Sequence, residues 1–292
     1  MSRLAHVARL ALSLRAIAAT FVALGLVATV APAGEAAPRP DVANIAHRGS
    51  SGAAPENTIA AIRLGLAHGA DVIENDIQRT KDGKLVILHD ASLARTTDVQ
   101  EVFPGRLSYD VGTFTLAEVK QLDAGSWFAP QFAGERVPTL REWVAAVGQR
   151  AGMLMEAKLP ERYPGIERDI DKELRSMGEF QRAVKAGRVT MQSFNHVWLR
   201  SYADLAPDVP VGVLFGTRPT EVDLNLAAQW ADQVNPALGV VQESDVARIH
   251  QLGLETHVWT VNGGQDMQRA IRWGVDGIIT NYPLVLEEIL RG

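Results

Sequence analysis

Cysteine is absent from the 292-residue chain, so no disulfide bond contributes to its stability. The stability of the folded chain must come from its hydrophobic core, to which a bound metal ion can add. Hydrophobic residues make up 47% of the sequence, which is enough for one large core. Barrel domains often reach this length as a single unit, and we therefore do not divide the chain.

An excess of basic residues is also absent, because the formal net charge is −5 at pH 7. Residues 1–33 contain three arginines and no acidic residue, so a chain without this segment has a net charge of −8. A protein this acidic is a poor candidate for non-specific binding to nucleic acid or to an anionic membrane surface. We therefore expect no nucleic-acid partner.

The N-terminal segment lacks an apolar run long enough to span a bilayer comfortably. Residues 1–33 combine a basic start, an apolar run over 16–30 and the triplet Ala-Pro-Ala at 31–33, which is typical of a signal peptide. We expect cleavage after Ala33, a secreted protein and no stable membrane insertion afterwards; an uncleaved N-terminal anchor is the alternative. No arginine pair is present, which favours the general export route. Residues 34–42 are predicted to be a flexible lead-in.

No stretch resembles the G-x-G-x-x-G cofactor turn, which disfavours a doubly wound open sheet. Apolar runs instead alternate with amphipathic segments. One predicted strand ends near Ala46. The other predicted strands span residues 71–77, 152–158, 189–194, 209–215, 232–235, 255–261 and 277–280. One predicted helix starts at Asn57 or Thr58. The other predicted helices span residues 140–149, 166–177, 196–205, 224–231, 243–252, 265–273 and 284–290. This order predicts an α/β protein with a (β/α)8 TIM-like barrel over residues 43–292.

The alternation is interrupted after the second barrel strand. A turn at residues 81–84 leads into a further short strand at 85–90, and residues 91–138 contain mainly loop-forming sequence. Only residues 116–122 suggest a helix, with Thr115 as its cap. We interpret 91–138 as a small insertion, either a lid that shapes substrate access or a structural cap.

Acidic residues occur where two barrel strands end. Glu74 and Asp76 share one face of their strand. Asn75 lies on the other face, where an apolar residue is expected, and we therefore predict a strand end that is wetter than usual. Glu156 and Lys158 share a face of another strand. Because strand ends converge at the barrel mouth, three carboxylates can form a site for Ca²⁺ or Mg²⁺. Lys158 can neutralise a phosphate oxygen, or form a structural salt bridge.

Six short motifs then occur in order: HRG at 47–49, PENT at 55–58, GAD at 69–71, Glu-x-Asp at 74–76, TKDG at 80–83 and HD at 89–90. Together they resemble the glycerophosphodiester phosphodiesterase family, and the resemblance covers essentially the whole mature chain. It implies that Glu74, Asp76 and Glu156 bind one divalent cation. An extracellular setting favours Ca²⁺ over Mg²⁺.

The resemblance also implies roles for the remaining site residues. It places His47 and His89 at the acid/base positions, Arg48 and Lys158 at phosphate-binding positions, and Gln192 and Trp259 at substrate-binding positions. Trp259 would pack on the glycerol, although core packing is the alternative, and Gln192 could instead satisfy backbone groups. Asn281 departs from the family, which often carries Asp there. His257, inside an apolar strand, is expected to be a satisfied core residue.

The implied activity is metal-dependent hydrolysis of small-molecule glycerophosphodiesters, such as glycerophosphocholine and glycerophosphoethanolamine, to sn-glycerol 3-phosphate and an alcohol. The cation would neutralise phosphate oxygens, and the two histidines would serve as acid and base because imidazole titrates near neutrality. One alternative is a phospholipase D-like or sphingomyelinase D-like enzyme of the same superfamily. Another is a non-catalytic phosphate- or lipid-binding protein.

Overall fold

The computed structural model describes residues 41–292, which fall within one compact unit. The predicted signal peptide at 1–33 and residues 34–40 of the predicted lead-in lie outside the described residues. Val42, the last residue of the predicted lead-in, is buried against the core. Within residues 41–292, no helix is both long enough and apolar enough to cross a membrane.

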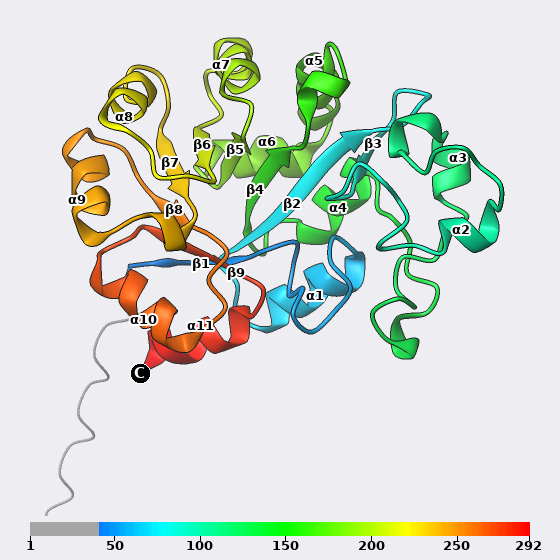
Figure 1. Cartoon of the computed structure of the whole chain (residues 1–292), viewed down its shortest axis with the longest axis horizontal. Helices are drawn as coiled ribbons and strands as arrows, with labels where there is room; N and C mark the ends of the chain where they lie inside the picture. The colour runs from blue at the N-terminus through cyan, green and yellow to red at the C-terminus, as the bar shows by residue number, and fades with distance from the viewer. Residues whose placement is uncertain (1–40) are drawn as a thin grey trace, which may run out of the picture. The chain divides into compact units, whose positions relative to one another are not determined.

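Eight parallel strands form a nearly closed barrel with helices around its outside (Figure 1). They are β1 (Ala43–Ala46), β2 (Val72–Arg79), β4 (Gly152–Ala157), β5 (Val189–Ser193), β6 (Val211–Phe215), β7 (Gln233–Pro236), β8 (His257–Val258) and β9 (Gly277–Thr280). The strand order is β7-β6-β5-β4-β2-β1-β9-β8, and two isolated bridges connect β7 to β8. The predicted TIM-like barrel is thus confirmed.

Local capping signals account for where several helices begin. Thr58 Oγ1 accepts from Ala61 N at the start of α1 (Ile59–Ala67), so Thr58 rather than Asn57 is the cap. Thr139 forms a capping box with Glu142 at the start of α4 (Leu140–Val147). The later outer helices are α5 (Ile166–Arg175), α6 (Gly178–Lys185), α7 (His196–Leu205), α8 (Glu221–Ala227), α9 (Glu243–Gln251), α10 (Gly264–Arg272) and α11 (Pro283–Arg291). Our prediction missed α6, which begins at a glycine without a side-chain cap.

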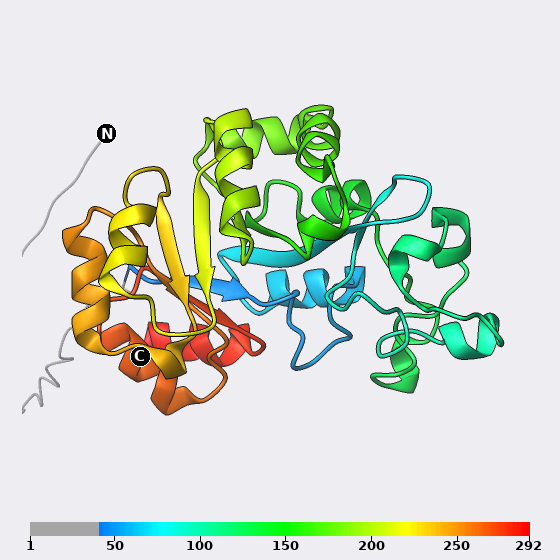
Figure 2. The ribbon, with the colours of Figure 1, turned by 45° about the horizontal axis from the view of Figure 1, so that its top comes forward.

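The insertion is attached to the barrel through a hairpin. β3 (Leu85–Ile87) pairs antiparallel with the last part of β2, with Ile87 opposite Ile77. The chain then forms α2 (Val99–Val102), η1 (Val111–Thr113), α3 (Leu116–Val119) and η2 (Pro130–Phe132), which lie beyond β3 on one side of the barrel (Figures 1 and 2). Phe114 and Leu122 are fully buried in this region. The insertion therefore packs as an extension of the main core.

Two buried polar side chains lack hydrogen-bond partners among the described residues. Asn75 points away from the barrel interior, is 0% exposed, and has no hydrogen-bond partner among the described residues for either side-chain atom. The wetter strand end expected from Asn75 stays a prediction. His257 is buried as predicted, but its Nδ1 has no partner among residues 41–292, so it is not a satisfied core residue.

Candidate active site

A cavity of about 140 Å³ lies at the carboxyl ends of the barrel strands. Eight of the nine residues predicted for the site line it: His47, Arg48, Glu74, His89, Glu156, Lys158, Gln192 and Trp259. The ninth, Asp76, lies behind this lining and contacts Arg48 and Lys158. Parallel strands direct their carboxyl ends to the same edge, and this geometry gathers residues that are far apart in sequence.

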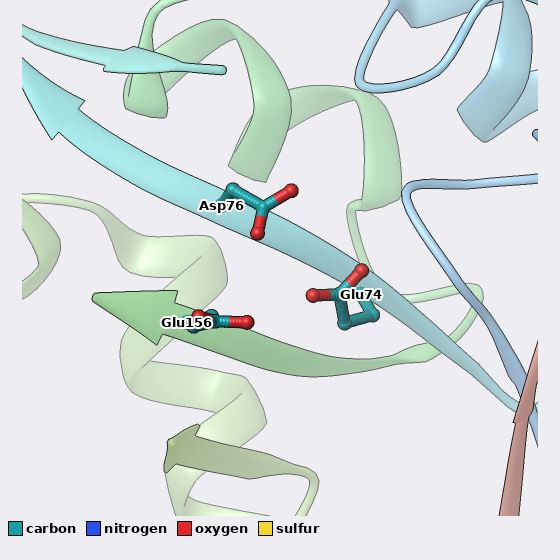
Figure 3. A group of neighbouring side chains, drawn as sticks. All are labelled: Glu74, Asp76 and Glu156. Atoms are coloured by element: carbon teal, nitrogen blue, oxygen red, sulfur yellow. The ribbon is translucent and has the colours of Figure 1, made fainter. Parts of the chain in front are cut away.

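Three buried carboxylates form the floor of the site. Glu74 and Asp76 belong to β2 and Glu156 to the neighbouring β4, with Asp76 directly opposite Glu156 in the parallel register (Figure 3). One carboxylate oxygen of each lies within 4.8 Å of the others, and the three residues are 1%, 0% and 6% exposed. Asp76 Oδ1 has no hydrogen-bond partner among the described residues. This set of oxygen donors fits a divalent cation, and carboxylates alone do not distinguish Ca²⁺ from Mg²⁺.

Burial and mutual repulsion oppose full ionisation of the carboxylates. Burial, together with the charge of Asp76, raises the pKa of Glu74 well above its usual range. Burial likewise raises the pKa of Glu156 to about 7, although Lys158 acts in the opposite direction. Burial would also raise the pKa of Asp76, but Lys158 and Arg48 outweigh it and hold that pKa below its usual range. A bound cation would favour the ionised form of these carboxylates, in the opposite direction to burial.

Two cationic side chains sit against these acids. The backbone N of Arg48 donates to Glu74 Oε2 (2.7 Å), and its Nε lies 3.3 Å from Asp76 Oδ2. Lys158 Nζ donates to Glu156 Oε1 (2.7 Å) and lies 3.5 Å from Asp76 Oδ1. Both therefore present positive charge where an anionic substrate would approach the carboxylates.

The turn after β1 requires the glycine of the HRG motif. Arg48 and Gly49 both have left-handed backbones, with φ of 58° and 80°. A Cβ at Gly49 would lie 2.5 Å from the backbone carbon of Ala61 in α1. Glycine therefore allows the turn to pass against α1, which brings the Arg48 backbone to Glu74.

The two histidines have different partners. His47 Nδ1 lies 2.7 Å from Asn281 Oδ1, and because an amide oxygen only accepts, Nδ1 carries the proton and Nε2 is left as the acceptor. Burial, followed by the charge of Arg48, lowers the pKa of His47 to about 4. His89 Nδ1 instead lies 2.6 Å from a carboxylate oxygen of Asp90. The imidazole of His47 is thus held neutral, whereas that of His89 has a negatively charged partner.

Arg95, from the insertion, is a site-supporting residue that our sequence reasoning missed. Its Nε and Nη2 donate to Asp90 (2.6 and 3.0 Å), and its Nη1 and Nη2 donate to Glu56 (both 2.8 Å). Glu56 in turn accepts from Arg48 Nη1 (2.9 Å). A continuous chain of charged contacts therefore runs from His89 to Arg48. The sequence signal that could have identified Arg95 is an arginine followed by Thr-Thr, five residues after the HD motif.

Other residues that we did not predict support the site from behind. Asn57 donates to Asp76 Oδ2 (2.8 Å) from a left-handed backbone position. Asn235 contacts both residues predicted to bind substrate, Gln192 and Trp259. Its Nδ2 donates to Gln192 Oε1 (3.2 Å), and its backbone carbonyl accepts from Trp259 Nε1 (2.7 Å). Phe194 also lines the cavity, with its ring edge-on to that of Trp259 at 5.4 Å between centroids.

A parallel barrel whose mouth holds three buried carboxylates, two histidines and two cations defines an enzyme-type site suited to a phosphate ester. The profile of the Glycerophosphoryl diester phosphodiesterase family matches residues 47–285. The chain belongs to this family, and it is a glycerophosphodiester phosphodiesterase by that membership.

Individual relatives agree with the assignment. The chain is 38% identical to a glycerophosphodiester phosphodiesterase of Caldanaerobacter subterraneus subsp. tengcongensis, covering 85% of this chain and 97% of the relative. It is 35% identical to a glycerophosphodiester phosphodiesterase of Bacillus subtilis, covering 86% and 87%. Among solved structures, a phosphodiesterase from Oleispira antarctica in complex with the product sn-glycerol-3-phosphate is similar with a TM-score of 0.72 and 28% identity, covering 85% and 96%.

Proposed function

We propose that the chain hydrolyses small glycerophosphodiesters to sn-glycerol 3-phosphate and a free alcohol. The observation that carries this proposal is one cavity that combines a three-carboxylate cluster with two imidazoles held by different partners. The Oleispira antarctica relative, whose structure contains sn-glycerol-3-phosphate, supports the choice of product. In net terms, the bond between phosphorus and the alcohol oxygen breaks, and water supplies the new phosphate oxygen and the proton of the alcohol.

The partners of the two histidines support different roles. His47 is neutral, and its Nε2 has no hydrogen-bond partner in the part of the chain that the structure describes, so we assign it as the base that takes a proton from the attacking group. Asp90 can stabilise positive charge on the ring of His89, so we assign His89 as the acid that protonates the departing alcohol.

The remaining residues would bind and orient the diester. A divalent cation bound by Glu74, Asp76 and Glu156 would supply positive charge to the phosphate oxygens. Arg48 and Lys158 add fixed positive charge beside them. Trp259 presents an aromatic wall against which the glycerol can pack, and Gln192 presents an amide to the same cavity.

Two further parts of the proposal concern the environment of the enzyme. We propose that residues 1–33 direct export and are removed, and that Ca²⁺ is the native cation because it is often plentiful outside cells. N-terminal sequencing of protein recovered from culture medium tests the first point. A mature chain that begins at Gly34 is expected, and full-length chain retained in the cells would contradict it.

The activity is tested by measuring release of sn-glycerol 3-phosphate from glycerophosphocholine by metal-stripped protein supplied with Ca²⁺, Mg²⁺ or chelator. Metal-dependent release is expected, with the greater rate in Ca²⁺. Sphingomyelin is measured in parallel, and activity on it alone would overturn the assignment in favour of a phospholipase D-like enzyme. Full activity in chelator would overturn the role of the metal.

Variants separate the histidines from the rest of the site. His47→Ala and His89→Ala should each lower turnover by at least ~100-fold, as expected for loss of a positioned acid or base. His250→Ala provides the matched control, because that histidine lies on the outer helix α9 and binds Asp276. Near-normal turnover in either site variant would remove that histidine from the mechanism.

A further inference from the structure

The catalytic cavity is too small for a complete glycerophosphodiester. Its volume of about 140 Å³ lies below the roughly 300–1,000 Å³ typical of pockets that enclose a small organic molecule. Glycerol and phosphate occupy this space under the proposed function, because Trp259 and the two cations line it. The alcohol half of the diester must therefore extend beyond the cavity.

A larger groove adjoins the cavity on one side. Its volume is about 510 Å³, and it shares Glu156, Lys158 and Phe194 with the cavity lining. The loop after β4 and the segment from β5 into α7 form the rest of its wall. Since Lys158 is a proposed phosphate-binding residue, the groove begins where the alcohol oxygen would leave phosphorus.

The side chains of the groove have an acidic and aromatic character. Phe194 is 45% exposed although Lys158 Nζ lies over its ring at 5.5 Å from the centroid, so a substrate cation would contact the part of the ring that Lys158 leaves exposed. Glu161 is exposed and accepts from Asn195 Nδ2 (3.0 Å), and it forms no ion pair with another of the described residues. Lys158, the one lysine or arginine in the wall, is already paired with Glu156. The groove thus offers a carboxylate that has no ion-pair partner among the described residues, beside an aromatic ring that is partly covered by Lys158 and Trp259.

The backbone of this groove is also constrained. Leu159, directly after Lys158, has a left-handed backbone with φ of 45° and is 38% exposed at the groove. Non-glycine residues seldom adopt this conformation, and it usually persists where the surrounding structure requires it. The turn brings Glu161 into the same wall as Phe194.

We propose that this groove is the binding subsite for the alcohol half of the diester, and that it selects alcohols carrying a positively charged amine, including quaternary ammonium. The proposal rests on the proposed function and deepens it. Phe194 would contact the cation through its ring, and Glu161 would balance its charge. An anionic alcohol would instead meet the unpaired carboxylate of Glu161.

The test compares kcat/KM for two diesters that share the glycerol phosphate half: glycerophosphocholine, with a cationic alcohol, and glycerophosphoglycerol, with a neutral one. The choline diester should be preferred by the wild type. Glu161→Gln should lower the choline-to-glycerol ratio of kcat/KM by about 2- to 5-fold, and Glu161→Lys should lower it further. Glu288→Gln, an equal charge change on the distant helix α11, is the control and should not alter the ratio.

Inhibition by sn-glycerol 3-phosphate adds an independent measurement, because this product lacks the alcohol half. Its inhibition constant should be the same in wild type and Glu161→Gln. A choline-to-glycerol ratio that is unchanged in both Glu161 variants would overturn the alcohol subsite, while leaving the proposed function intact. Failure of the wild type to hydrolyse either diester would overturn the proposed function, and the subsite with it.

Discussion

Arg95→Ala tests whether the insertion positions the proposed acid. Arg95 makes four hydrogen bonds of 2.6–3.0 Å to Asp90 and Glu56, and its hydrogen bond is the main reason that the pKa of Asp90 falls to about 2. Without Arg95, Asp90 keeps His89 as its partner but loses the group that fixes its own position. Loss of a residue that orients a functional histidine typically costs about 10- to 100-fold, and a misplacement near 1 Å can cost ~100-fold.

The size of the effect distinguishes positioning from stability. The Arg95 side chain is 44% exposed, and ion pairs of exposed residues contribute only about 0–1 kcal/mol to folding. We therefore expect kcat to fall about 10- to 100-fold while the unfolding midpoint changes little. Arg95→Lys should recover only part of the rate, because an ammonium group cannot hold two carboxylates in a bidentate fork. Added guanidinium should partly restore Arg95→Ala.

Steady-state kinetics and thermal unfolding on the same samples provide the assay. Arg106→Ala is the matched control, because it removes an arginine that pairs with Glu118 within the insertion, away from His89. A kcat within about twofold of wild type for Arg95→Ala, or a higher KM at unchanged kcat, would refute the positioning role.

Three other predictions follow from buried groups. Ca²⁺ should raise the thermal unfolding temperature more at pH 8 than at pH 6, because the pKa of Glu156 is about 7 and protons compete with the cation. Scanning calorimetry measures this increase in the unfolding temperature. An increase in Glu156→Gln equal to that of the wild type would contradict the prediction. Burial lowers the pKa of His257 from 6.5 to about 4, so the unfolded chain binds the proton more tightly and stability must fall as pH decreases from 6.5 towards 4. The pKa difference corresponds to a loss of roughly 3 kcal/mol in the free energy of unfolding. His257→Gln should abolish this loss when urea unfolding is measured from pH 6.5 to pH 4. Parallel curves of stability against pH for the wild type and the variant would refute the prediction. Asn75→Val should raise the free energy of unfolding by about 1–3 kcal/mol, because it removes a buried amide that has no partner within residues 41–292, and because valine suits a strand. A lower free energy of unfolding in urea would show that the amide is satisfied.

The hydrophobic periodicity of the segments and their order along the sequence were sufficient to predict the barrel and its insertion. The alternation along β2 placed Glu74 and Asp76 together, and the convergence of strand ends brought Glu156 to them. The links between distant segments could not be predicted in the same way. Arg95 reaches Glu56 across 39 residues, and Asn235 reaches Gln192 across 43. Such contacts depend on how long side chains lie in space, which local spacing does not encode. Asn281 was noted only as a departure, although it holds His47.

The pairing of the first and last barrel strands has a consequence for biogenesis. β1 lies beside β9, and His47 at the end of β1 binds Asn281, 234 residues later in the chain. The ribosome releases these two partners at opposite ends of synthesis, so a nascent chain contains His47 long before its partner exists. The imidazole therefore acquires its fixed tautomer only when the final βα unit docks. Catalytic competence should therefore appear only after Asn281 has been synthesised, and chains shortened to end before Asn281 should lack it even where the carboxylate cluster has formed.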